Sequence, residues 1–159
     1  MRPHGGTLWQ QRMRVCAATL ALLSVLTGCA QAYPIPRAPQ GNPIDAARAL
    51  SDAPEEVRNG DAANTCGEFA LDQGDGVPTE AVDCLSTALA SQQEAELAWT
   101  LPTTEGDPLV YFAFVGGGND EVTVITTNAF DSYGGDPTWT STSCADVRVA
   151  TSWAGCANP

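Results

Sequence analysis

Residues 109–126 read LVYFAFV-GGGND-EVTVIT, and this stretch decides the fold. Residues 109–115 are all apolar or aromatic, which predicts a strand that is covered on both faces. Three glycines and an Asn-Asp pair follow, a composition typical of the turn in a β-hairpin. The β-branched run EVTVIT follows over residues 121–126 and predicts the returning strand of the hairpin. The stretch therefore predicts an antiparallel hairpin.

Shorter elements surround this hairpin. Apolar and polar or small side chains alternate over residues 96–101, which predicts a half-buried strand. Pro78 suits a first helical turn, and the apolar face after it predicts a helix over residues 78–91. Further strands are expected at residues 67–71, at Trp139 and over residues 147–153. Together these elements predict an α+β domain over residues 64–159, a small antiparallel meander with one helix packed on it.

Residues 1–28 are typical of a lipoprotein signal peptide. Two arginines precede an apolar run over residues 15–26, which suits a secretory leader and falls short of the roughly 20 residues that span a bilayer. The tetrapeptide LTGC then ends at Cys29 and resembles a lipobox, so we expect cleavage before Cys29 and acyl chains on its sulfur. Residues 30–32 read Ala-Gln-Ala, an alternative cleavage site that would release a secreted protein.

The segment after the leader, residues 29–63, contains five prolines and few large apolar residues. We therefore expect a flexible tether there. Ile44, Ala47 and Leu50 share one face of a possible short helix, but Pro54 interrupts the pattern. A lipid-anchored tether would hold the domain at the outer face of the cytoplasmic membrane, and two acyl chains give a stable anchor.

Four cysteines remain in the predicted domain, namely Cys66, Cys84, Cys144 and Cys156. In an oxidising compartment they predict two disulfides with three possible connectivities. We favour pairing of sequence neighbours, Cys66 with Cys84 and Cys144 with Cys156. No C-x-x-C spacing occurs, which favours structural bridges over a redox or metal role.

The charge balance excludes several classes of function. Cleavage before Cys29 leaves 19 acidic side chains against four arginines, a formal charge of −15. Nucleic-acid binding needs clustered basic side chains and is therefore excluded. The only histidine is His4 in the leader, and the chain has no lysine. Histidine-dependent nucleophiles, histidine zinc sites and Walker-A phosphate loops are excluded as well. We expect no cofactor, no bound metal and no catalytic residue.

A motif of the form T-x-E-G-D-P-[IL] occurs over residues 103–109. Together with a following hairpin and closing cysteines it resembles a domain-of-unknown-function family in Gram-positive lipoproteins. The matching pieces are residues 103–109, 122–127 and 131–134 with Cys144 and Cys156. The resemblance covers residues 95–156, and the chain departs from it in the insertion at residues 134–137. It implies export and a small disulfide-bonded domain, but it implies no activity.

Glu105 and Asp107 flank Gly106 in this motif, and Asp131 and Tyr133 lie in a later loop. Two nearby carboxylates can act as acid and base in glycoside hydrolysis. A surface turn leaves both solvated, so we favour a backbone role in which Gly106 supplies a positive φ and Asp107 caps the turn. Loop carboxylates also suit calcium, but no segment has EF-hand spacing. Glu105, Asp107, Asp131 and Tyr133 therefore stand as candidate binding residues.

Two functions remain open. The favoured one is a non-enzymatic, membrane-anchored lipoprotein whose acidic domain binds an envelope protein or ligand. The alternative is a carboxylate-dependent hydrolase of cell-envelope polymers that uses Glu105 with Asp107 or Asp131.

Overall fold

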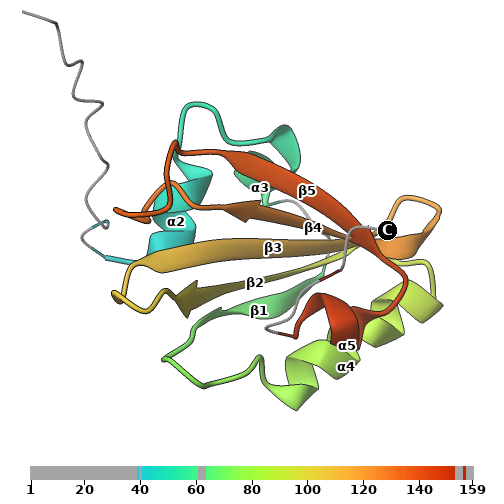
Figure 1. The fold of residues 1–159 in the computed structure, drawn as a ribbon. Coiled ribbons are helices and arrows are strands. Elements are labelled where there is room, and N and C mark those ends of the chain that lie inside the picture. The colour runs from blue at the N-terminus through green and yellow to red at the C-terminus, as the bar shows by residue number, and fades with distance from the viewer. Residues whose placement is uncertain (1–38, 40, 61–63, 153–155, 157–159) are drawn as a thin grey trace, which may run out of the picture. The chain divides into compact units, whose positions relative to one another are not determined.

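The hairpin predicted over residues 109–126 lies within a five-stranded sheet of order β1-β2-β3-β4-β5 (Figure 1). The computed structural model describes residues 39, 41–60, 64–152 and 156. Its elements are α2 (Pro43–Arg48), α3 (Glu55–Asn59), β1 (Thr65–Ala70), α4 (Thr79–Ala90), β2 (Ala95–Pro102), β3 (Pro108–Gly116), β4 (Asn119–Thr127), β5 (Trp139–Cys144) and α5 (Val147–Ala150). The fold is mixed α+β, as predicted, with a larger sheet and more helices than expected.

Strands β2 to β5 form an antiparallel meander, and β1 is added parallel to β2. Helix α4 connects these two strands, since a parallel neighbour needs a crossover rather than a tight turn. The helix predicted over residues 78–91 is confirmed by α4. The expectation of a purely antiparallel sheet is wrong for the β1–β2 pair, because alternation along a strand does not reveal the direction in which it pairs.

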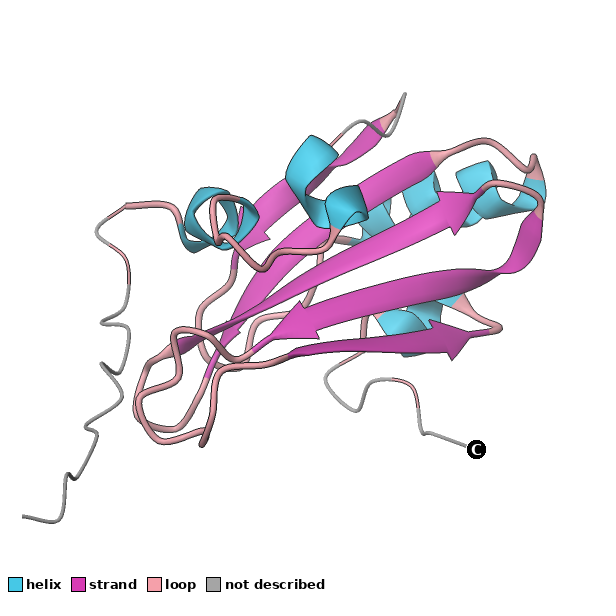
Figure 2. Ribbon diagram, turned by 90° about the horizontal axis from the view of Figure 1, so that it is seen from above, coloured by secondary structure: helices cyan, strands magenta, loops and turns pink. Residues whose placement is uncertain are grey.

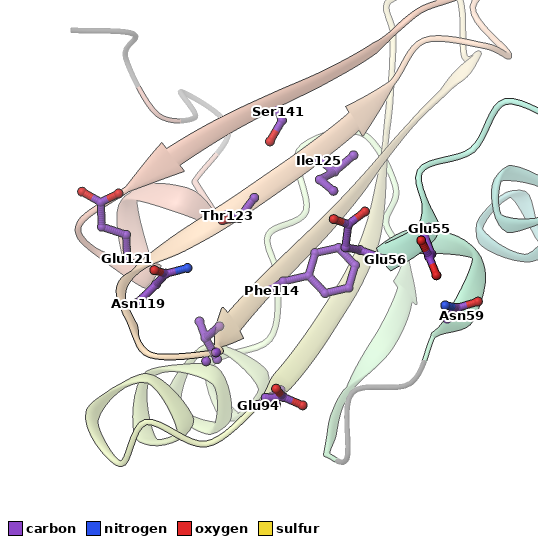
Figure 3. Close-up of a pocket in the computed structure, with 14 residues that line it drawn as sticks. Glu55, Glu56, Asn59, Glu94, Phe114, Asn119, Glu121, Thr123, Ile125 and Ser141 are labelled. Carbon is purple, nitrogen blue, oxygen red and sulfur yellow. The ribbon is translucent and has the colours of Figure 1, made fainter.

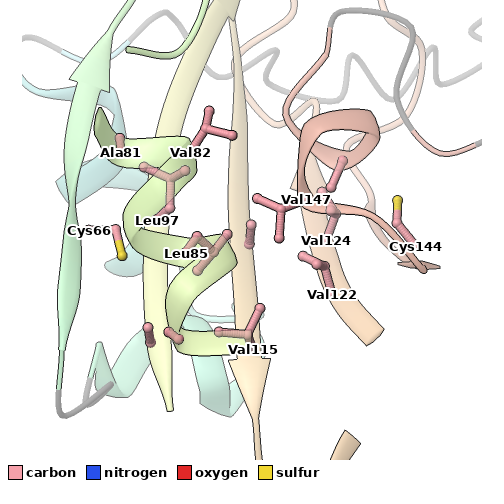
Figure 4. Close-up of a cluster of buried hydrophobic side chains, with 14 of the residues drawn as sticks. Cys66, Ala81, Val82, Leu85, Leu97, Val115, Val122, Val124, Cys144 and Val147 are labelled. Atoms are coloured by element: carbon pink, nitrogen blue, oxygen red, sulfur yellow. The ribbon is translucent and has the colours of Figure 1, made fainter. Parts of the chain in front are cut away.

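Each face of the sheet carries its own apolar cluster, with helices on both sides (Figure 2). On one face, α4 and α5 pack over Leu97 and Trp99, and the Trp99 ring stacks on Tyr111 at a centroid distance of 5.2 Å. Figure 4 shows this cluster, with Leu85 of α4 lying beside Leu97. On the opposite face, α2 and α3 pack over Ala98 and Phe112. Residues 109–115 are therefore covered on both faces of the sheet, as predicted.

The flexible tether predicted over residues 29–63 is wrong for residues 43–59, which form α2 and α3. Asn42 caps α2 by accepting a hydrogen bond from the Ile44 amide at 2.9 Å, and Pro43 occupies the first turn, where proline is favourable. Ile44 and Val57 are almost completely buried against the sheet. The same helices cover the face of β2 that was expected to be solvated, so β2 is buried rather than half-buried.

The expected strand over residues 147–153 is also wrong, because α5 begins there. The Asp146 carboxylate accepts hydrogen bonds from the Arg148 and Val149 amides at 2.7 and 3.3 Å, which is the geometry of a helix N-cap. Burial of Val147 and Ala150 in the α4 cluster completes the turn. Capping and packing therefore outweigh the strand preference of the two valines.

Both favoured disulfides are confirmed. Cys66 bonds to Cys84, which joins β1 to α4 across 18 residues of chain, and Cys144 bonds to Cys156 across 12 residues. The Cα atoms lie 5.7 and 5.6 Å apart, within the range that disulfides span. The first bridge closes the β1-α4-β2 crossover, and the second fixes the chain after α5 to the end of β5.

The leader over residues 1–28, Cys29 and the alternative cleavage site at residues 30–32 lie outside the described residues. Within the described part of the chain, none of the helices has the length and apolar composition to cross a bilayer.

Candidate functional site

The four candidate binding residues come from two loops at one end of the sheet. Glu105 and Asp107 lie in the β2–β3 turn, and Asp131 and Tyr133 lie in the β4–β5 loop. The Asp107 carboxylate accepts a hydrogen bond from the Ser132 amide at 2.8 Å, so this side chain joins the two loops. The Tyr133 side chain is exposed to 79 %.

Local hydrogen bonds occupy the carboxylates of this loop pair. Asp131 accepts from the Tyr133 amide at 2.9 Å, and Glu105 accepts from the Thr104 hydroxyl at 2.8 Å. Gly106 has a φ of +91°, the positive value that was expected of it. Among the described residues, no three acidic, histidine or cysteine side chains gather as a metal cluster would require. These contacts favour a clamp between loops over an acid–base pair.

A groove of about 550 Å³ lies elsewhere, on the sheet face that α2 and α3 only partly cover (Figure 3). Its floor consists of side chains from three neighbouring strands, namely Phe114, Thr123, Ile125 and Ser141. One wall is α3, and the far end is the β3–β4 turn with Asn119. The groove exists because α2 packs on β2 and β3 and α3 has only five residues, so the part of the same face around Thr123 and Ser141 stays uncovered.

The charge of this groove has one sign. Glu55, Glu56, Glu94 and Glu121 line it, and no arginine is among its lining residues. All four glutamates are exposed at the rim, whereas Ile125 on the floor is buried. A cleft lined by charges of one sign concentrates ligands of the opposite sign. We call this site the acidic groove; it suits a cationic group attached to a short apolar segment.

Gly116 allows the end of the groove to form. Its φ is +105°, and a Cβ atom there would lie 2.7 Å from the Cα of Glu94. The end of β3 therefore packs directly on the chain that enters β2, and this contact sets the position of Glu94 at the groove. Any larger residue at this position would push the two segments apart.

A partly buried ion cluster holds α3, which is the wall of the acidic groove, against the sheet. The Arg48 guanidinium donates to Glu68 at 2.8 Å, to Glu96 at 2.6 Å and to the Val57 carbonyl at 2.9 Å. Its carbon lies 4.9 Å from the centroid of the Phe112 ring, a cation–π distance. Arg48 thus joins α2, α3 and two strands of the sheet.

Burial governs the ionisation of this cluster. Glu96 is exposed to only 3 %, and burial raises its pKa above the ordinary 4.5, while the Arg48 bonds lower the pKa by less and the Glu68 charge raises it further. Burial lowers the pKa of the Arg48 guanidinium, and its bonds to Glu68 and Glu96 raise it by more. The cluster faces the helices and not the acidic groove, so its role is structural.

The acidic groove is not predicted by the sequence, because the pattern around Glu55 and Glu56 indicated a flexible tether. Two signals were available. Asn42 and Pro43 form a cap followed by a first-turn proline, and Pro54 before two glutamates is a second helix start. The floor residues carried no signal, because alternation in a strand does not show which face stays uncovered.

Comparison of the chain with protein-family models, with curated proteins and with solved structures gives no match. The function is therefore argued from the site alone.

We predict that Arg48→Ala lowers the free energy of unfolding by about 3–5 kcal/mol, because it leaves Glu96 buried without its partner. Arg58→Ala is the matched control, since Arg58 is an exposed arginine on α3, and we expect a change within about 0.5 kcal/mol. Urea denaturation of residues 30–159, which contain every described element, measures both. Equal losses for the two variants would contradict the anchoring role.

The raised pKa of Glu96 predicts a pH dependence. A carboxyl with a higher pKa in the folded state binds its proton more readily there, so rising pH above about 4.5 costs stability until the group is ionised in both states. The stability of the native sequence should therefore fall relative to Glu96→Gln as pH rises through the window just above 4.5. Denaturation curves of both proteins between pH 4 and 8 test this. A difference that is constant, or that changes in the opposite direction, would exclude the assignment.

Proposed function

We propose that this protein is a lipid-anchored, non-catalytic binding protein of the bacterial cell envelope, and that the acidic groove receives a cationic ligand or partner. The observation that carries the proposal is the groove itself, with four glutamates around an apolar floor and no basic side chain among them. The lipobox before Cys29 and the resemblance to Gram-positive lipoproteins support the location. The hydrolase alternative remains an untested prediction. The hydrogen bonds that occupy Glu105, Asp107 and Asp131 make these carboxylates less suitable as an acid–base pair.

Two features of the acidic groove favour binding over turnover. Its glutamates are exposed, whereas a general acid among carboxylates needs a desolvated position. Its floor offers the half-buried Phe114 to an apolar group while the rim offers charge, a combination that orients an amphipathic cation. Both features suit recognition of a positively charged side chain with an aliphatic stem, such as lysine or arginine.

We predict that a short acetylated Lys-Leu-Lys-Leu amide binds residues 30–159 and that Glu56→Gln with Glu121→Gln weakens its binding about fivefold to thirtyfold. Two exposed charge contacts contribute about 0.5–1 kcal/mol each, and 1.4 kcal/mol is a factor of ten. Asp75→Asn with Glu80→Gln removes the same charge away from the groove and should change the affinity less than twofold. Isothermal titration calorimetry at 50 and 150 mM salt measures all three proteins.

Equal weakening by both double variants would mean that net charge alone attracts the peptide, and the acidic groove would then not be the site. Absence of binding by this peptide and by free spermine at low salt would overturn the proposed function altogether.

The proposed anchor makes a separate prediction for the full chain in a bacterial host. The protein should take up labelled palmitate and remain with the membrane fraction, whereas Cys29→Ala should lose both properties. Cys16→Ala is the matched control, because Cys16 lies in the leader that is expected to be removed, and its label should persist. Label that survives Cys29→Ala would show that the acyl group is attached elsewhere and would contradict the proposed anchor. A native chain that takes up no label and is found free in the medium would favour the secreted alternative.

A further inference from the structure

We infer that the ligand of the acidic groove is an extended basic peptide segment, which adds to the free edge of β5 as a sixth strand. The inference rests on the proposed function and deepens it, because it names both the class of partner and the way in which it binds. Strand addition at an exposed sheet edge is a common mode of peptide recognition.

Within the described residues, the edge of β5 is regular and has no strand on its outer side. It pairs with β4 in an unbroken antiparallel register from Val122↔Cys144 to Thr127↔Trp139. On its other side β5 has no strand neighbour within the described part of the chain, and both ribbon views place it at the rim of the sheet (Figures 1 and 2). Residues 139–144 read WTSTSC, with no charge, no proline and no bulge. Such an edge presents free backbone donors and acceptors to a partner.

The opposite edge of the sheet, β1, differs in each of these respects. Its pairing with β2 shifts register between Thr65 and Glu68, and Gly67 sits in the shift with a φ of +112°. Glu68 adds a charge, and its side chain is bound to Arg48. Bulges and charges are devices that prevent strand addition. The sheet is therefore blocked at β1 and open at β5.

The register places an added strand beside the acidic groove. Ser141 pairs with Ile125, and Ser143 pairs with Thr123, so these serines share the face that forms the groove floor. A sixth strand would run about 4.8 Å beyond β5, and its alternate side chains would project over the same face. Glu121 of β4 is the rim glutamate nearest this edge, because Glu94 precedes β2 and Glu55 and Glu56 lie on α3. Its charge favours lysine or arginine in the added strand.

Charge complementarity also decides between two possible occupants. A second copy of this chain, cleaved before Cys29, could pair its own β5 with this edge, but it would bring a formal charge of −15 to a surface that is already acidic. Repulsion between like charges disfavours such a pair. A basic extended segment meets both the free edge and the charge of the rim.

The test uses an eight-residue probe of alternating lysine and threonine, acetylated and amidated, with residues 30–159 unchanged in every arm. Two further probes carry N-methyl groups on all lysine amides or on all threonine amides. In an added strand only alternate N–H groups face the docking edge. We therefore expect one methylated probe to bind about as well as the parent and the other to lose at least tenfold, since several hydrogen bonds of about 0.5–1.5 kcal/mol disappear.

Amide hydrogen exchange provides the second readout. The parent probe should slow exchange in β5 and leave β1 unchanged. Equal affinity of both methylated probes, with no protection in β5, would overturn strand addition while leaving a charge-based ligand of the acidic groove intact. A dimer of the free protein that protects β5 and is not displaced by the probe would also overturn it, because the edge would then belong to a second copy. If the unmethylated lysine–threonine probe does not bind while Lys-Leu-Lys-Leu does, strand addition is rejected and the proposed function of the acidic groove stands.

Discussion

The Arg48 guanidinium is shared between carboxylates from two different strands, and it also holds the Val57 carbonyl of α3. Glu96 is buried, so its charge is tolerable only while this partner is present. Glu96 therefore keeps its ion-pair partner only while the layer formed by α2 and α3 packs on the sheet. That layer buries Phe112 and Ile44, and its outer end forms one wall of the acidic groove.

This contact is the common cause of two wrong predictions, the half-buried strand over residues 96–101 and the flexible tether over residues 43–59. Residues 96–101 were expected to be half-buried because Glu96 and Thr100 alternate with large apolar side chains, and glutamate is rarely buried without a partner. Residues 43–59 were expected to be flexible because they hold few large apolar residues. The partner of Glu96 lies 48 residues earlier in the chain. No local pattern connects the two segments, so each was judged without the other.

Features that depend on near neighbours were predictable from the sequence. The hairpin of residues 109–126, helix α4 and both disulfides arise from patterns within 20 residues or fewer. The parallel β1–β2 pair and helix α5 were not predicted, because they depend on packing and on the Asp146 cap. The candidate residues of the TEGDP motif come together, as Asp107 bonds to Ser132, but as a clamp between loops. The acidic groove could not be predicted, since an uncovered sheet face is a property of the helices that fail to reach it.

The revised boundary of the domain also changes where a partner must be. With the proposed anchor at Cys29, only residues 30–42 separate the lipid from α2, and thirteen residues reach at most about 45 Å when fully extended. A tether over residues 29–63 would have reached more than twice as far. On that proposal the acidic groove and the β5 edge would be held near the membrane surface. A basic segment of a neighbouring envelope protein would then meet them at high local concentration, and a modest affinity would suffice for binding.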